Sequence, residues 1–155
     1  MPQLNKGGKF VFGKSLLRDD LTLYVPPQAA DEYHICSEGR VYLFAGAKAT
    51  GGFCVTRQGL LLPSMLGRIL SDTPGLRDYT LPEGEFVPYK GRSYCWLGIS
   101  RSGMLQLTLP MLQTLELTAG IELMCIRSSN IAFTMGAKGP LLERAKNYAG
   151  EIPVY

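Results

Sequence analysis

An alternation of apolar and polar residues that ends at a proline occurs twice in this chain of 155 residues. The clearer copy is Leu105-Gln106-Leu107-Thr108-Leu109-Pro110, and the other is Leu21-Thr22-Leu23-Tyr24-Val25-Pro26. A period of two places Leu105, Leu107 and Leu109 on one face of a strand. Each strand is expected to end at its proline, because proline has no N–H to donate to a neighbouring strand.

The same series of elements is expected after each proline: a short helix, a glycine turn and a hairpin of two strands. In the second half these are residues 112–117, Gly120, 121–126 and 131–135, and in the first half they are residues 27–33, Gly39, 40–45 and 53–56. A further helix is expected after each hairpin, over 64–72 behind Pro63 and over 141–149 behind Pro140, since proline suits the start of a helix.

We therefore predict two copies of one unit, each with a trailing helix, over residues 10–75 and 96–150. Residues 76–95 are rich in proline and glycine and are expected to form a linker. A single unit has too little core and leaves strand edges unpaired. The fold class is thus predicted as mainly β, a β-barrel with short helices. The two units either close one pseudo-dimeric barrel within the chain or pair between chains in a homo-oligomer.

The order of strand, proline, short helix, glycine and hairpin resembles the SpoVT/AbrB swapped-hairpin family of DNA-binding regulators. The best match is Leu107-Thr108-Leu109-Pro110, followed by Leu115-Glu116-Leu117 and then Gly120. The resemblance implies two interleaved units and a non-enzymatic transcription regulator that binds double-stranded DNA. The family's DNA-contacting Lys and Arg residues lie near the first strand and the turn that follows it. By position, these are Lys14, Arg18 and Arg101 here.

The basic residues that this family usually carries just after the proline are missing. Met111-Leu112-Gln113 and Pro27-Gln28-Ala29 stand in those places, and the net charge is only +3. Each lost phosphate contact weakens salt-dependent affinity for DNA. The alternative function is therefore a diverged barrel that binds a protein partner or a small ligand instead of DNA.

The composition is that of a packed globular protein, with 46% hydrophobic residues. No apolar run approaches the roughly 18 residues of a membrane-spanning helix. The first residues lack the apolar core of a signal peptide. We expect a soluble, cytoplasmic protein that does not contact a membrane.

The residues used in most catalytic and metal sites are scarce. Four cysteines occur without a C-x-x-C pair, and His34 is the one histidine. The cysteines are expected to be reduced and buried as small hydrophobes. His34 is expected at the half-exposed start of a strand. We predict no enzyme activity, no metal and no cofactor.

Two glycine-rich segments have the composition of anion-binding loops. Residues 8–15 match the pattern G-x-x-x-x-G-K-S, but the apolar Phe10-Val11-Phe12 inside it favours a strand over a phosphate-binding loop. Residues 46–52 suit a wide hairpin loop better than a nest for phosphate. The apolar tail, residues 151–155, is expected to dock as an edge strand or at a subunit contact.

Overall fold

The chain folds mainly into β-structure, as the sequence predicts. The computed structural model describes residues 10–146 and 150–155, and these form nine strands and six helices. The strands are β1 (Val11–Leu16), β2 (Thr22–Tyr24), β3 (Arg40–Ala45), β4 (Phe53–Thr56), β5 (Val87–Tyr89), β6 (Arg92–Gly98), β7 (Met104–Gln106), β8 (Glu122–Arg127) and β9 (Phe133–Gly136). The helices are α1 (Pro27–Tyr33), α2 (Gln58–Leu61), α3 (Arg68–Asp72), α4 (Pro74–Arg77), α5 (Leu109–Leu115) and α6 (Pro140–Lys146).

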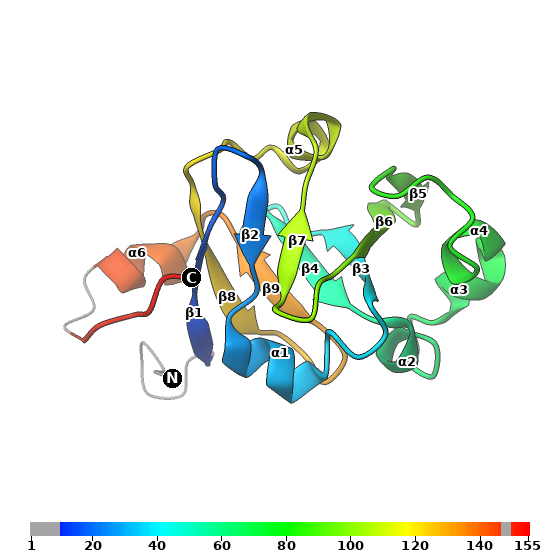
Figure 1. Ribbon diagram of the computed structural model, residues 1–155, viewed down its shortest axis with the longest axis horizontal. Coiled ribbons are helices and arrows are strands. Elements are labelled where there is room, and N and C mark those ends of the chain that lie inside the picture. Colours follow the sequence, from blue (N-terminus) through cyan, green and yellow to red (C-terminus); the bar gives the residue numbers. More distant parts are fainter. Residues whose placement is uncertain (1–9, 147–149) are drawn as a thin grey trace.

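Seven of the strands form one antiparallel sheet in the order β1-β8-β9-β4-β3-β6-β5, and β2 and β7 form a separate two-stranded ribbon. The ribbon lies over one face of the sheet (Figure 1). Pairings between the two halves of the chain hold the sheet together: β1 pairs with β8, β6 with β3, and β9 with β4. The two halves therefore interleave. The described strands do not close into one continuous ring.

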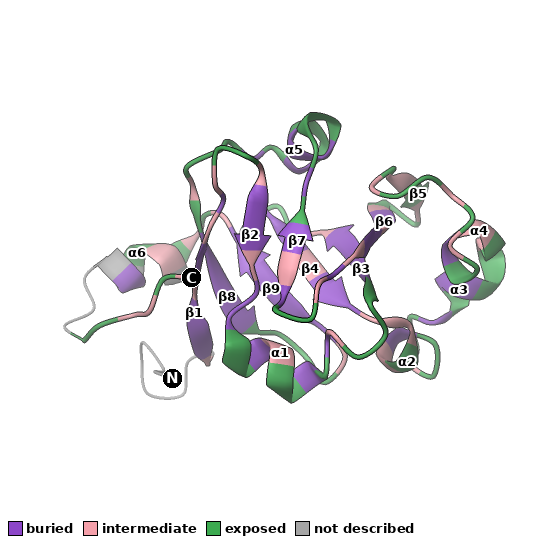
Figure 2. Cartoon of the chain, viewed as in Figure 1, coloured by how far each residue is buried: buried purple, intermediate pink, exposed green. Residues whose placement is uncertain are grey.

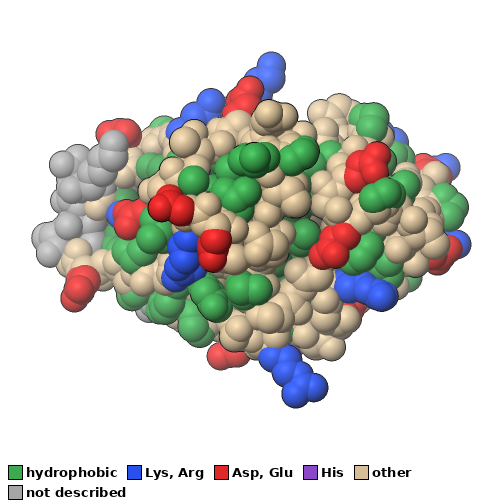
Figure 3. Space-filling view, turned by 45° about the horizontal axis from the view of Figure 1, so that its top comes forward, with side chains coloured by type: hydrophobic (Ala, Val, Ile, Leu, Met, Phe, Trp, Pro, Cys, Tyr) green, Lys and Arg blue, Asp and Glu red, His purple; other side chains and the backbone are tan. Residues whose placement is uncertain are grey.

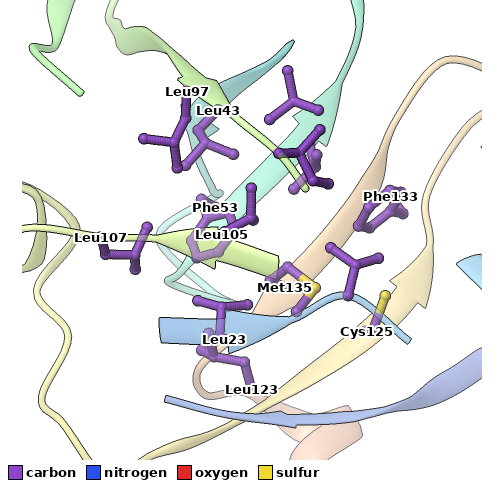
Figure 4. Packing of buried hydrophobic residues seen from close by; sticks show 14 of the residues in the cluster. Leu23, Leu43, Phe53, Leu97, Leu105, Leu107, Leu123, Cys125, Phe133 and Met135 are labelled. Carbon is purple, nitrogen blue, oxygen red and sulfur yellow. The ribbon is translucent and has the colours of Figure 1, made fainter. Parts of the chain in front are cut away.

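The main core fills the space between the ribbon and the inner face of the sheet. Leu23 and Leu105 face each other across the ribbon, and both are fully buried. Around them lie Phe53 of β4 and Phe133 and Met135 of β9 (Figure 4). Burial follows the strands and the inner sides of α1 and α5 (Figure 2), as expected where alternate strand residues point to opposite faces.

The outer face of the sheet is covered at its two ends. At one end, Leu61, Ile69 and Leu76 from the helical segment α2–α4 pack on Tyr42 and Phe44 of β3. At the other end, α6 packs through Ala145 on Met124 and Ile126 of β8 and on Val11 of β1. The middle of this face, where β4 pairs with β9, lies between the two coverings (Figure 1).

The strand before Pro110 is shorter than the alternation predicts. Leu105 and Leu107 are buried as expected, but Leu109 is 66% exposed and begins α5. The reason is a helix cap, because the Thr108 side chain accepts a hydrogen bond from the Met111 N–H at 3.3 Å. Pro110 lies within the first helical turn, where its missing N–H costs nothing.

The segment after the first hairpin also differs from the expectation. Instead of one helix over 64–72, it forms α2, α3 and α4 as three separate short turns of helix, with Pro63 between the first two. The expected linker, residues 76–95, contains β5 and the start of β6. The expected helix over 141–149 is present as α6, and residues 147–149 lie outside the described part of the chain.

The tail runs beside β1 and docks there as an edge strand, which is one of the two expectations for it. The Lys14 N–H donates to the Pro153 carbonyl and the Tyr155 N–H donates to the Lys14 carbonyl, both at 2.8 Å.

The last two residues of the glycine-rich motif, Lys14 and Ser15, lie within β1. The motif of residues 8–15 is therefore not followed by a helix, which a phosphate-binding loop requires.

Candidate functional site

Lys14, the first residue assigned to DNA by the resemblance, lies near the tail and pairs with an acid. Its Nζ is 3.8 Å from Glu122 Oε1 on the neighbouring strand β8. This carboxylate offsets the Lys14 charge, which lowers its value as a phosphate contact.

Arg18, the second of these residues, lies over a tyrosine of the ribbon. Its guanidinium carbon is 4.8 Å from the centre of the Tyr24 ring. Asp19 and Asp20 follow it directly. The Thr22 hydroxyl donates to Asp20 Oδ1 at 2.6 Å, and this hydrogen bond lowers the pKa of Asp20. The carboxylate beside Arg18 is thus negative at neutral pH.

Arg101, the third, is exposed in the turn between β6 and β7. It lines a shallow hollow together with Asp31, His34 and Cys36 of the α1 region.

The prediction that His34 begins a strand is wrong. His34 ends α1 with a left-handed backbone (φ 50°), and its N–H bonds the Ala30 and Asp31 carbonyls. The chain reverses here, so the side chain points to solvent.

The basic residues of the described chain are spread out, and five of them are paired with an acid. On the face in Figure 3, the Lys and Arg side chains form separate groups, several of them beside Asp or Glu. Ion pairs join Lys14 to Glu122, Arg57 to Glu38, Arg68 to Asp72, Arg77 to Asp78 and Arg127 to Glu32. This pattern differs from the continuous basic stripe of most DNA-binding surfaces.

A large cavity lies on the outer face of the sheet, over the junction of β4 and β9. Its volume is about 600 Å³, which is within the usual range for small-molecule sites. Phe44, Ile126, Ile131 and Leu142 give it apolar walls. It occupies the uncovered middle of the outer sheet face, between α6 and the α2–α4 segment.

No family model matches the chain, and no curated protein matches it in sequence. The assignment of a function therefore rests on the geometry of the cavity and on the charges around it.

The floor of the cavity carries one thiol and one hydroxyl that contact each other. Cys54 of β4 and Thr134 of β9 are paired across the two strands, and Cys54 Sγ is 3.4 Å from Thr134 Oγ1. The Thr134 hydroxyl is also within hydrogen-bonding distance of the Ser128 hydroxyl. The Cys54 thiol and the Thr134 and Ser128 hydroxyls therefore form hydrogen-bonding contacts with one another. They make up one polar spot on the floor of the cavity.

Two cationic side chains, Arg92 of β6 and Lys138 after β9, also line the cavity. Neither forms an ion pair with a described residue, in contrast to the five basic residues above. The described lining contains no acidic side chain. The cavity is therefore apolar with a positive rim.

The described residues do not form the clusters that metal sites require. The described residues contain no group of three or more His, Cys, Asp and Glu side chains placed to hold a metal ion. All four cysteines are free, with Cys95 and Cys125 buried and Cys36 and Cys54 partly buried. None of the described helices has the length and apolar character needed to cross a membrane.

Cys54 is expected to react slowly with alkylating reagents. Burial raises the pKa of its thiol, while the Thr134 contact and the Arg92 charge oppose this more weakly. A raised pKa favours the protonated form, and the thiolate is the reactive form. The rate at which iodoacetamide labels Cys54 is measured by peptide mass spectrometry at a series of pH values. This rate should continue to rise with pH above 8.5, the ordinary pKa of a cysteine thiol. Labelling that levels off below pH 8 would contradict this placement of Cys54.

The sequence did not single out the cavity, because its lining comes from distant segments. The sequence predicts Cys54 as a buried hydrophobe and places Arg92 in the expected linker. The one sequence pattern that points to the cavity is the alternation of side chains in β4 and β9. It places Cys54 and Thr134 on the face opposite Phe53 and Phe133.

Proposed function

We propose that this protein is a non-enzymatic binding protein that holds a small, largely apolar ligand in the cavity over β4 and β9. The observation that carries the proposal is the uncovered middle of the outer sheet face, where about 600 Å³ of space has apolar walls. A concave apolar site with a few polar groups is the usual form of a small-molecule site. This proposal corresponds to the alternative function given by the sequence, a diverged barrel that binds a small ligand instead of DNA.

We further propose that its frame is a duplicated swapped-hairpin unit of AbrB type, whose two copies pair within one chain as a pseudo-dimer. The pairing of Leu23 with Leu105 supports this, since these residues are 82 positions apart. The same shift relates α1 to α5 and β3 to β8, residue for residue. This shift of 82 positions is two fewer than the 84 positions that separate Pro26 from Pro110. Both shifts place the same residues on the same face of a strand, because side chains alternate with a period of two.

Hydrogen bonds between the two halves follow the same shift. The Leu17 N–H donates to the Ile121 carbonyl at 2.9 Å, and the Ile99 N–H donates to the Gly39 carbonyl at 3.0 Å. The Val25 N–H donates to the Gly103 carbonyl, and its counterpart, the Leu107 N–H, donates to the Leu21 carbonyl. Such reciprocal bonds are expected of two equivalent units around a two-fold axis.

Binding of double-stranded DNA through Lys14, Arg18 and Arg101 stays a prediction. Against it stand the Lys14–Glu122 ion pair and the acidic neighbours of Arg18. Fluorescence anisotropy with a labelled duplex at low salt tests it. We expect only weak binding that Arg101→Ala lowers slightly, because one exposed arginine contributes about one phosphate contact. Tight binding that Arg101→Ala abolishes would favour the regulator instead.

The cavity proposal is tested with the neutral dye N-phenyl-1-naphthylamine, whose fluorescence rises in apolar surroundings. We expect saturable binding of one dye per chain, and a loss of at least about tenfold in affinity in Ser128→Trp, which places an indole in the cavity. Ser128 is exposed, so the change is compatible with the fold. Ser102→Trp, exposed on the opposite side near Arg101, is the matched control.

The outcomes of this titration separate the alternatives. Equal affinities for the wild type and both variants would place the dye elsewhere and contradict the proposal. An absence of saturable binding in the wild type would also contradict it. Circular dichroism of both variants establishes that they are folded.

A further inference from the structure

We infer that the ligand is an organic anion, an apolar body that carries one carboxylate, sulfonate or phosphate group, held between Arg92 and Lys138. This inference rests on the proposed function, since it names the class of ligand for the same cavity. It is carried by the two cations in the cavity lining and by the absence of an acid from the described part of that lining.

Arg92 is held in position without being neutralised. Its guanidinium carbon lies 5.5 Å from the centre of the Phe44 ring, and Phe44 stacks on Tyr94 with ring centres 5.3 Å apart. Stacking on an aromatic face fixes the guanidinium plane and leaves its N–H groups free to donate. Arg127 differs, because it lies over Phe10 but its N–H groups are taken by Glu32.

Lys138 is anchored through its backbone, and its side chain passes Gly51 between the cavity and a second hollow that Glu116 also lines. Its N–H donates to the Thr50 carbonyl at 2.9 Å, and the Ala137 N–H donates to the same carbonyl at 2.8 Å. These bonds join the end of β9 to the β3–β4 loop and fix the position of the Lys138 backbone. Its side chain is exposed and forms no ion pair with a described residue.

The hydroxyl groups in the cavity lining already have partners within the protein. The Thr50 hydroxyl donates to the Ala47 carbonyl, and the Ser128 hydroxyl lies within hydrogen-bonding distance of Thr134. The charged donors left for a ligand are therefore those of Arg92 and Lys138. An anionic group at the rim would accept hydrogen bonds from charged donors, which are stronger than bonds between neutral groups. The apolar body would then lie against Ile126, Ile131 and Leu142. Charge and apolar surface are thus arranged for one amphiphilic molecule.

The experiment compares two dyes that share one ring system. N-phenyl-1-naphthylamine is neutral, and 1-anilinonaphthalene-8-sulfonate differs from it by one sulfonate group. We expect the sulfonate dye to bind about tenfold more tightly. Arg92→Gln and Lys138→Gln should each weaken its binding about threefold to fivefold, as for exposed charge pairs. The neutral dye should bind both variants as it binds the wild type.

Matched charge losses elsewhere are the controls. Arg101→Gln and Lys90→Gln remove the same charges from exposed turns outside the cavity lining, and both should leave the sulfonate dye's affinity unchanged. All four changes are at exposed positions, and circular dichroism establishes that the variants are folded.

Three results would overturn the inference, and they differ from one another. If the neutral dye binds in the cavity and the sulfonate dye binds no tighter, the anion inference fails while the proposed function stands. If Arg101→Gln weakens the sulfonate dye as much as Arg92→Gln does, the effect is one of general charge and the assignment to the rim is wrong. If neither dye binds, the proposed function fails and the inference fails with it.

Discussion

Replacing Phe133 by alanine is expected to lower the free energy of unfolding by about 3–5 kcal/mol, the usual cost of removing a buried aromatic ring. Phe133 is fully buried and lies on the inner face of β9. Its ring centre is 5.2 Å from that of Tyr33 on α1. The cavity left behind would therefore lie where the two halves of the chain meet. Urea unfolding followed by circular dichroism measures the change.

The form of the unfolding curve is a second part of this prediction. The halves share one core and one sheet, so Phe133→Ala should shift a single transition. Phe53→Ala, in β4, should have a similar effect because Phe53 is also fully buried in the same core. Leu109→Ala is the control, with an expected change within about 0.5 kcal/mol at an exposed position. Two transitions, of which only one moves, would contradict an interleaved fold.

Gly52→Ala is expected to destabilise the protein by about 2–4 kcal/mol, through both strain and a clash. Gly52 has φ 64°, a conformation that side chains rarely adopt, and a Cβ atom there would lie 1.9 Å from the Met135 carbonyl oxygen. Since Met135 belongs to β9, the added methyl group would push β9 away from the entry to β4. Thermal and urea unfolding measure the loss.

Gly39→Ala separates strain from steric exclusion. Gly39 has a similar φ of 70°, but a Cβ atom there would meet nothing within 4 Å. The expected cost is only about 1–2 kcal/mol, that of a left-handed residue with a side chain. Equal effects of the two substitutions would mean that β4 and β9 do not approach each other this closely.

The strands of the first hairpin were predictable because local pattern determines them, whereas β5 and the start of β6 lie in the expected linker. The boundaries of β3 and β4 agree with the prediction, since each is a compact apolar run between turn residues. The helices after the first hairpin were not predictable in detail. Their apolar residues Leu61, Ile69 and Leu76 are set by the surface of β3 that they cover, and sequence periodicity does not record such tertiary contacts.

The candidate site was less predictable than the fold. Lys14, Arg18 and Arg101 could be named by position, but their partners Glu122 and Tyr24 follow only from the folded arrangement. Arg92 and Lys138 are far apart in sequence and line one cavity because β6 and β9 lie on either side of the β4–β3 pair. Non-local contacts of this kind need the complete sheet order.

The most direct test of the cavity proposal is to locate the bound dye by NMR. Intermolecular NOEs between N-phenyl-1-naphthylamine and the methyl groups of ¹³C-labelled protein report atoms within about 5 Å of one another. The account predicts NOEs to Ile126, Ile131 and Leu142, which line the cavity. NOEs confined to the exposed side chains of Leu62 and Met65, with none to the three cavity residues, would contradict it.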